Sequence, residues 1–253
     1  MLRYALLFII VLPAGIFFMT CSNKQKEAFA EVETKDHSAV VPAVQTAEWA
    51  VEWWMPRHDS ISKRLKEGNV DLLFIGNSIT HGWENIGREC WDKYYEPRNA
   101  VNMGFSGDRT QHVLWRLEHS DFTNISPRLA VLMIGTNNSD GDDNTAEEIA
   151  DGIIKICKML RIELPSTKIL LLAIFPRDSL PTAQRQKNAT ASKLASAIAD
   201  NRTIYYLDIN SHFLTKDGVL TRDIMYDYLH PTEKGYRIWA EAMEPEIAKL
   251  MKK

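Results

Sequence analysis

Residues 71–82, Asp-Leu-Leu-Phe-Ile-Gly-Asn-Ser-Ile-Thr-His-Gly, decide how the rest of the chain is interpreted. The apolar run is too short for a solitary helix and lacks helical spacing, which favours a strand buried on both faces. In open parallel sheets, ligands bind at the carboxyl ends of the strands. Ser78 follows this strand, after Gly76, and a sharp turn there would expose its hydroxyl as a nucleophile. The same residues also fit a simple turn with a helix N-cap.

After residue 71 the chain alternates short apolar runs with stretches of helical periodicity. This alternation predicts βαβ units and an α/β fold, with a five-stranded parallel sheet covered by helices on both faces. Pro245 lies inside the last helical stretch and should kink or break it. The expected strands are 71–76, 99–103, 129–135, 168–175 and 203–209, and the expected helices are 57–68, 107–118, 144–164, 182–200 and 233–251.

The first 46 residues have the pattern of an export signal followed by a tether. A basic start and a short apolar run give residues 1–21 the layout of a signal peptide. Cys21 directly follows the run and precedes a polar stretch, as the lipidated Cys does in bacterial lipoprotein signals; Ala28-Phe29-Ala30 is an alternative cleavage site. Residues 22–46 are polar and are predicted to be a disordered tether. We therefore expect a domain over residues 47–253 that is exported and anchored to a bacterial membrane, in the periplasm or at the cell surface.

Charge and cysteine content exclude some classes of partner and site. The net charge of −3 and the absence of a basic face argue against a nucleic-acid partner. The three cysteines have no metal-ligand spacing, and the sequence implies no metal or cofactor. Cys90 and Cys157 either pair after export or remain buried free thiols.

Small and polar residues follow the predicted strands. The segments 102–108 and 135–138 come after the second and third strands, and 226–232 precedes the last helix. Asp227 and His230 are three residues apart, so one turn brings both side chains to the same place. Taken singly, each is explained as a turn former or a cap. Their joint occurrence favours one site at the carboxyl edge of the sheet.

Three tryptophans lie close together just before the first helix, at positions 49, 53 and 54. They are interpreted either as packing for the start of the domain or as a platform for stacking a sugar. The sequence alone leaves both alternatives open.

These blocks resemble the SGNH (GDSL) hydrolase superfamily, named after Ser, Gly, Asn and His in four such blocks. The resemblance covers about residues 70–250 and is greatest to the branch containing the platelet-activating-factor acetylhydrolase catalytic subunits. Exported bacterial carbohydrate O-acetyl esterases look similar too. The likeness implies a three-layer α/β/α flavodoxin-like fold. It is carried by residues 104–108, 112–117, 133–138 and 226–230.

The resemblance implies a role for each matching position. Ser78 would be the nucleophile, His230 its general base and then acid, and Asp227 the residue that orients His230. The backbone N–H groups of Ser78 and Gly104, with the side-chain amide of Asn137, would form the oxyanion hole. These residue types suit the chemistry, because a Ser hydroxyl needs an adjacent base and the tetrahedral intermediate needs preorganised donors.

Two positions depart from the family pattern. Asn77 stands where the family has Asp, which keeps the acceptor oxygen but removes the charge. Pro231 follows His230 where an apolar side chain is expected, and it restricts the conformation of His230. We expect activity to survive the change at position 77, with the tuning of the oxyanion loop left open, and Pro231 is compatible with a positioned His230.

The expected activity is that of a serine esterase that cleaves short acyl esters, above all acetyl esters, through an acyl-enzyme. A small-molecule or polysaccharide ester is the expected substrate. The export signal and the Trp-rich start of the domain favour an acetylated polysaccharide, and hence a carbohydrate O-acetyl esterase. A phospholipid acetylhydrolase or lipase is the alternative. Rival interpretations are an acyltransferase and a non-catalytic carbohydrate-binding lipoprotein on the same fold. The oligomeric state is not predicted.

Overall fold

The computed structural model describes residues 36–252. The predicted signal peptide, the lipidation candidate Cys21 and the first part of the predicted tether lie outside the described residues. No helix within residues 36–252 is long and apolar enough to cross a membrane.

Five parallel strands form one sheet in the order β2-β1-β3-β4-β5, as the alternation of apolar runs and helical stretches predicts. The central strands are almost entirely buried, which is the mark of a parallel sheet covered on both faces. The strands are β1 (Leu72–Gly76), β2 (Ala100–Gly104), β3 (Leu129–Met133), β4 (Lys168–Leu172) and β5 (Ile204–Leu207).

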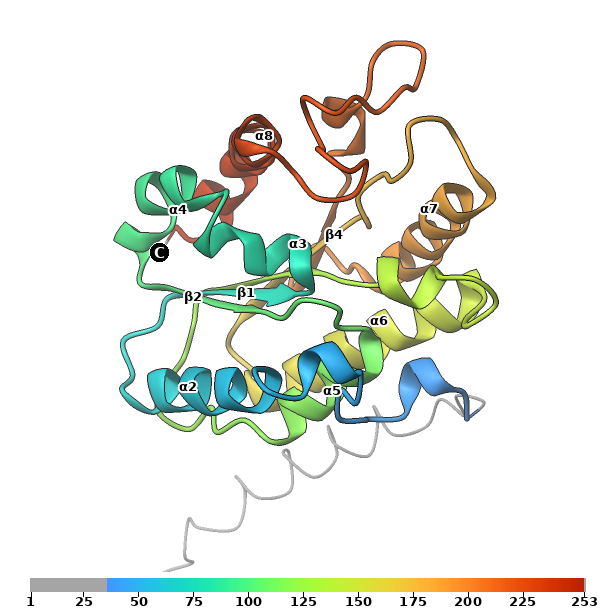
Figure 1. Cartoon of the computed structure of the whole chain (residues 1–253). Coiled ribbons are helices and arrows are strands. Elements are labelled where there is room, and N and C mark those ends of the chain that lie inside the picture. Colours follow the sequence, from blue (N-terminus) through green and yellow to red (C-terminus); the bar gives the residue numbers. More distant parts are fainter. Residues whose placement is uncertain (1–35, 253) are drawn as a thin grey trace, which may run out of the picture. The chain divides into compact units, whose positions relative to one another are not determined.

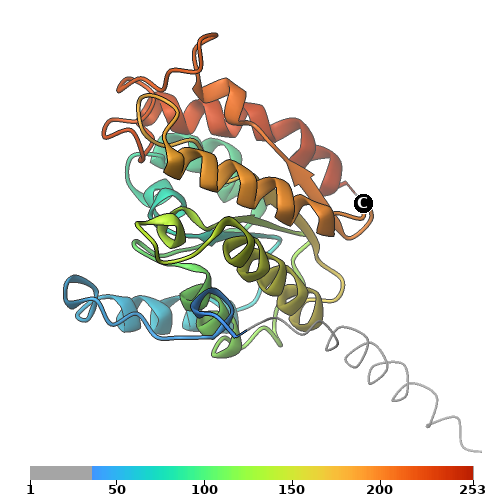
Figure 2. The same cartoon turned by 90° about the vertical axis from the view of Figure 1, so that its right-hand side faces the viewer.

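Helices cover both faces of the sheet and complete the three predicted layers (Figure 1). One face carries α2 (Trp54–Lys66), α5 (Thr110–Glu118), α6 (Ala146–Glu163) and α7 (Ala183–Ala195). Figure 2 shows α6 and α7 running side by side. The other face carries α3 (Ser78–His81), α4 (Arg88–Tyr94) and α8 (Glu233–Leu250). Short 3₁₀ helices lie at Ser38–Val40, Glu48–Ala50, Gly82–Glu84, Glu96–Arg98, Thr136–Ser139, Ser196–Ile198 and Asn210–Phe213.

The two hydrophobic cores lie on opposite faces of the sheet. Along β1, Leu73 and Ile75 belong to one core and Leu72 to the other, because successive strand residues point to opposite faces. Cys157 lies in the first core and Cys90 in the second, so the two cannot pair, and both are buried free thiols. Burial raises the pKa of the Cys157 thiol to about 12.

The predicted break at Pro245 is wrong. Helix α8 continues through this residue to Leu250. Proline removes one backbone hydrogen bond from a helix. Here Met243 and Ile247, on either side of it, are fully buried, and this packing keeps the helix continuous.

The prediction of disorder is also wrong for residues 36–46. Ala39 and Val40 are buried, and Lys155 Nζ donates to the Val40 carbonyl at 2.8 Å. The backbone N–H of Ala43 donates to the Gln111 carbonyl at 3.1 Å. The segment 36–53, called the N-terminal strap below, is therefore packed against the domain.

Candidate active site

The central strands bring the candidate residues to one edge of the sheet. β1 lies between β2 and β3, with Gly76 in register with Gly104 and with Met133. Ser78 and Asn137 both follow these strand ends within a few residues. Asn77 shapes the turn, since its buried side chain accepts a hydrogen bond from the backbone N–H of Ile79 at 3.0 Å.

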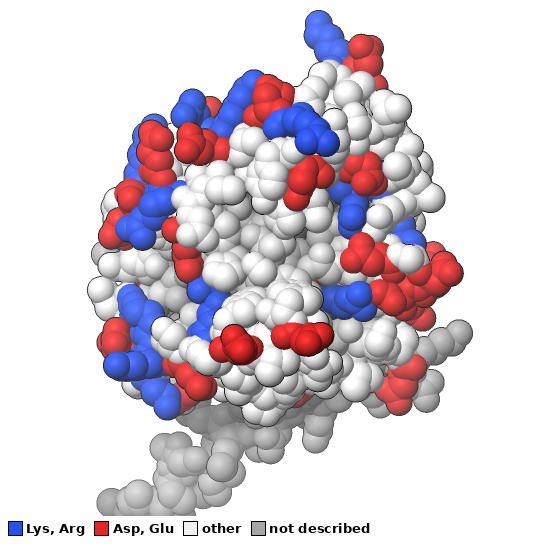
Figure 3. Space-filling view, viewed as in Figure 1, with Lys and Arg blue, Asp and Glu red and all other residues white. Residues whose placement is uncertain are grey.

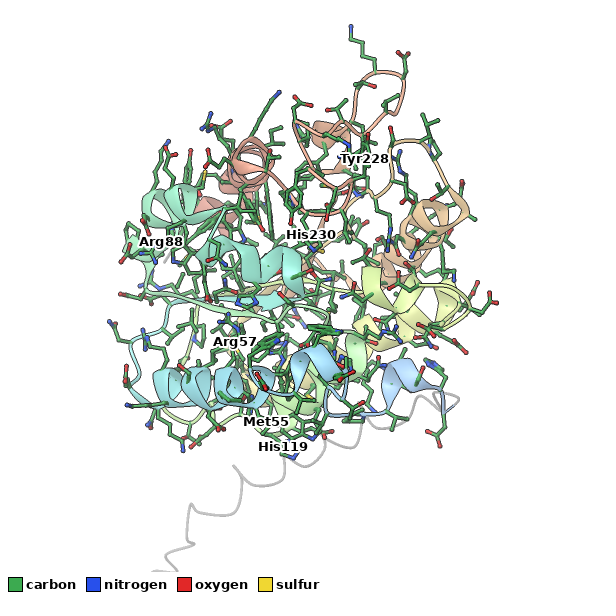
Figure 4. All side chains as sticks on the ribbon, viewed as in Figure 1. Met55, Arg57, Arg88, His119, Tyr228 and His230 are labelled. Carbon is green, nitrogen blue, oxygen red and sulfur yellow. The ribbon has the colours of Figure 1, made fainter. Side chains whose placement is uncertain are left out.

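Ser78, His230 and Asp227 form a continuous chain of hydrogen bonds. Ser78 Oγ lies 2.8 Å from His230 Nε2, and His230 Nδ1 lies 2.7 Å from Asp227 Oδ2. Because a carboxylate only accepts, Nδ1 carries the ring hydrogen and leaves Nε2 free to accept from Ser78. Figure 4 labels His230 in the region between α3 and the loop that carries Tyr228.

A tight loop before α8 holds His230 in place. Met225 and Pro231 form an antiparallel bridge, and the backbone N–H of Tyr226 donates to the His230 carbonyl at 3.1 Å. Tyr228 takes a left-handed conformation with φ 65° at the tip. Pro231 therefore closes the loop that carries His230.

Asp227 is bound both by the imidazole and by the loop backbone. Its Oδ1 accepts from the backbone N–H groups of His230 at 2.7 Å and Leu229 at 3.0 Å. Partial burial raises the pKa of Asp227, but the hydrogen bonds from His230 and Leu229 outweigh it, and the pKa is lowered overall. Asp227 therefore stays ionised and can stabilise a cationic His230.

The structure argues against Gly104 as an oxyanion-hole donor. Its backbone N–H donates to Asn102 Oδ1 at 2.8 Å and is not free. A Cβ at Gly104 would lie 2.3 Å from the backbone nitrogen of His81, so this glycine allows α3 to pack closely on β2. Its role is therefore in packing.

Gly107 is a better candidate for that role than Gly104, because its backbone N–H is free among the described residues. Within residues 36–252, the backbone N–H groups of Gly107 and Ser78 have no acceptor. Asn137 Nδ2 donates one hydrogen to the carbonyl of Asp108, next to Gly107, at 2.9 Å. The second amide hydrogen of Asn137 remains available. Sequence reasoning missed Gly107, although it stands in the same segment, 102–108, as Gly104. Its φ of +75°, a value that favours glycine, is seen only in the structure.

A buried ion pair supports the loop that carries Gly107. Asp108 and Arg116 are both fully buried, and Arg116 Nε donates to Asp108 Oδ2 at 2.8 Å. Trp54 Nε1 donates to Asp108 Oδ1 at 2.7 Å, so this tryptophan belongs to the core. Burial raises the pKa of Asp108 to about 6 against the opposing effect of Arg116 and Trp54.

Ser78 opens onto a pocket of about 220 Å³ that also contains Ser106, Tyr226 and Asn85. His81 lies in the same pocket, with Nδ1 at 3.1 Å from Ser106 Oγ, and was not assigned to the site from sequence. Burial and the neighbouring Arg57 lower the pKa of His81 to about 4, so its ring is neutral near pH 7. His81 therefore contacts Ser106 rather than Ser78.

Charges are interspersed on the face that contains the site. Figure 3 shows acidic and basic side chains mixed around its margin, while few lie at the centre, where Figure 4 labels His230. Among the described residues, no cluster of three or more His, Cys, Asp or Glu side chains could hold a metal ion.

Fold and site together define an ester-hydrolysing enzyme of the SGNH class. The sequence pattern of the GDSL-like lipase/acylhydrolase family matches residues 74–238, and the chain belongs to this family. A curated relative, platelet-activating factor acetylhydrolase IB subunit alpha2 of Rattus norvegicus, is 35% identical over 199 residues, which are 78% of this chain and 85% of the relative.

Solved structures share the fold at lower identity. A GDSL-like lipase from Bacteroides thetaiotaomicron aligns with a TM-score of 0.59 and 21% identity, over 76% of this chain and 97% of its own. An acetylxylan esterase from Geobacillus stearothermophilus aligns with a TM-score of 0.56 and 19% identity, over 71% and 94%. Both likenesses concern the arrangement of sheet and helices.

Proposed function

We propose that the protein is a serine esterase that removes short acyl groups, above all acetyl, from a carbohydrate through an acyl-enzyme. The observation that carries the proposal is the hydrogen-bonded chain from Ser78 Oγ through His230 to Asp227. Nucleophile, base and orienting acid lie at the distances that acyl transfer requires.

In the first step, Ser78 Oγ attacks the ester carbonyl while its proton passes to His230 Nε2. The tetrahedral oxyanion accepts hydrogen bonds from the backbone N–H groups of Ser78 and Gly107 and from the Asn137 amide. Asp227 stabilises the imidazolium. The C–O bond to the alcohol then breaks, and the alcohol leaves with the proton from Nε2.

In the second step, water attacks the acyl group on Ser78. His230 takes a proton from the water and returns it to Ser78 Oγ as the acid is released. The same donors stabilise the second oxyanion, so one geometry serves both halves of the reaction.

The pocket beside Ser78 supports a short acyl group and a polar alcohol. It has a volume of about 220 Å³ and contains the polar side chains of Asn85, Ser106 and Tyr226. The lining also includes Ile86, Pro231 and Tyr236, so the support for a short acyl group comes from the limited volume. The structural likeness to an acetylxylan esterase is consistent with this choice.

The second candidate is a phospholipid acetylhydrolase. It is favoured by the 35% identity to the platelet-activating factor acetylhydrolase subunit. The catalytic residues contact only the ester group and serve either substrate.

The experiment that separates the two candidates is acetate release by the full chain from acetylated xylan and from an acetyl-glycerophospholipid, with Ser78→Ala as the blank. Release from xylan alone supports the carbohydrate esterase. Release from the phospholipid alone contradicts it in favour of the second candidate. Turnover by Ser78→Ala at the wild-type rate would refute the nucleophile assignment.

The protein is also proposed to be exported and anchored through a lipid on Cys21. The sequence of residues 1–21 supports this localisation. Cys21→Ser should move the protein from the membrane fraction to the soluble fraction of the cell, and an unchanged distribution would contradict lipid anchoring.

A further inference from the structure

A second cleft lies beside the candidate active site and is built in part by the N-terminal strap. Its volume is about 640 Å³, and its lining includes Trp49 and Gln45 of the strap together with Gly107 and Asn137. Asn137 and Gly107 are also the proposed oxyanion donors. A molecule bound in this cleft would therefore lie next to the reacting ester.

Hydrogen bonds hold the strap in this position. Gln45 Nε2 donates to the carbonyl of Gly107 at 3.4 Å, and its Oε1 accepts from the backbone N–H of Ala47 at 3.0 Å. Thr110 Oγ1 donates to the Ala39 carbonyl at 2.8 Å. The strap precedes residue 74, where the family match begins, so this wall of the cleft lies outside the matched region.

Trp49 gives the cleft an exposed aromatic surface. The residue is 57% exposed, whereas neighbouring Trp54 is buried. Its ring stacks on that of Trp53 at a centroid distance of 6.1 Å and an angle of 29°. The Cη2 atom of Trp49 lies against Gly107, and a Cβ added to Gly107 would be only 2.1 Å from that atom. A large exposed ring fixed beside the catalytic groups is unexplained by packing of the core.

Apart from the apolar Ala43, Val44 and Ala47, the remaining side chains of the lining are polar, and its charged groups are already paired. Arg109 forms an ion pair with Asp143 at 2.6 Å, and Asp140 accepts from Arg177 at 3.1 Å. Burial and the nearby Arg109 lower the pKa of His112 to about 4, so its ring is neutral near pH 7. An anionic headgroup would therefore find no free cation among these side chains. A neutral ligand with many hydroxyls would find both donors and acceptors.

We propose that this cleft is a binding subsite for a neutral sugar residue adjacent to the acetylated one, with Trp49 stacking on the sugar ring. An aromatic face presents apolar surface to the C–H face of a sugar. Gln111 Nε2, which donates to no partner among residues 36–252, and the second lone pair of Gln45 Oε1 can bond to the sugar hydroxyls. The inference rests on the proposed carbohydrate esterase function and specifies how an oligosaccharide is held.

Binding of unacetylated xylotetraose and cellotetraose to the full chain, measured by titration calorimetry, tests the subsite without depending on turnover. Wild type should bind at least one of the two, and Trp49→Ala should weaken that binding about tenfold or more. Trp49→Phe, which retains an aromatic ring, should remain within about threefold of wild type. Val51→Ala is the matched control, because Val51 lies on the same strap, is 61% exposed and does not line the cleft.

Absence of binding by wild type, or equal binding by Trp49→Ala, would overturn the subsite. Trp49-dependent sedimentation with phosphatidylcholine vesicles in place of sugar binding would overturn it in favour of a lipid surface. Acetate release from acetylated xylan in the same samples distinguishes the two proposals. Release that does not depend on Trp49 rejects the subsite alone, and Trp49-dependent sugar binding without release rejects the esterase function alone.

Discussion

At the scale of single residues, the central feature is the hydrogen-bonded chain from Ser78 through His230 to Asp227. The Oδ2 atom of Asp227 fixes the ring hydrogen of His230 on Nδ1. The same carboxylate holds the loop backbone through Oδ1. In the proposed mechanism, Asp227 therefore selects the tautomer, positions the ring and stabilises the imidazolium, whereas His230 transfers the proton.

We predict that His230→Ala lowers kcat by about 10⁴-fold or more. The fold-loss of kcat in Asp227→Asn should be about ten to a hundred times smaller than the loss in His230→Ala. The base is lost in the first variant. In the second, the base remains but is poorly oriented. Steady-state kinetics with a small aryl acetate provide the measurement. A greater loss in Asp227→Asn than in His230→Ala would contradict the assigned roles.

Asn77 supplies a second prediction at this scale. Its Oδ1 accepts from Ile79, and its Nδ2 is buried with no partner among the described residues. Asn77→Asp retains the acceptor oxygen and should keep kcat within about tenfold of wild type. Asn77→Ala removes the cap and should cost about 1–2 kcal/mol of stability. Thermal unfolding and aryl acetate kinetics check both, and equal damage in the two variants would show that the acceptor is unimportant.

The sequence was sufficient to predict Ser78, Asp227, His230 and Asn137 as candidates because each stands in a recognisable block after a strand or before a helix. Gly104 was predicted wrongly for a physical reason. Whether a backbone N–H is free depends on side chains that approach it in space, and here Asn102 takes the hydrogen of Gly104. No pattern of glycines in the sequence contains that information.

At the scale of elements, the loop from β2 to α5 is supported by a buried ion pair. Asp108 and Arg116 are fully buried, and their opposite charges compensate each other. The guanidinium also lies over the ring of Phe105 at 3.9 Å. This loop carries Ser106 and Gly107, so its order is linked to the proposed oxyanion donor Gly107.

Asp108→Asn should destabilise the protein by about 3–5 kcal/mol, because it leaves the buried Arg116 cation without a compensating charge. The double variant Asp108→Leu/Arg116→Leu should be less destabilised than the sum of its two single variants. Urea denaturation of Asp108→Asn, of the double variant, of its two single variants and of wild type measures both effects. Additive effects would show that the two charges do not interact.

Strands and most helices were predictable because the spacing of apolar residues marks their length and Gly or Pro residues mark their ends. The short helices α3 and α4 were missed, since elements of four and seven residues give too few turns for a periodic pattern. The strap was missed for another reason. Its polar composition suggested a tether, but Ala39 and Val40 fill a site formed by α5 and α6, which lie far away in the sequence.

At the scale of the whole molecule, buried neutral histidines make stability depend on pH. The pKa of His112 is lowered to about 4 by burial, Arg109 and Arg116, and that of His81 is lowered to about 4 by burial and Arg57. A histidine in the unfolded chain has a pKa of about 6.5. Between these values the unfolded state binds more protons, so the free energy of unfolding decreases as the pH falls.

We predict that His112→Gln reduces this loss of stability between pH 6.5 and pH 4 by about 1–3 kcal/mol. Gln retains an acceptor for the backbone N–H of Arg109, which His112 Nδ1 accepts at 3.1 Å. Urea denaturation at pH 6.5, 5.5 and 4 provides the measurement. His119→Gln is the control, because His119 is exposed and directly follows α5, the helix that contains His112. An equal pH dependence in wild type and His112→Gln would contradict the prediction.

The assignment of Ser78 as the nucleophile is tested most directly by labelling the full chain with a fluorophosphonate that reacts with activated serines. Mass spectrometry of the digested protein should find one adduct, on the peptide that contains Ser78, and none in Ser78→Ala. Labelling of a different serine, such as Ser106 in the same pocket, would contradict the account, as would aryl acetate turnover by a chain that takes up no label.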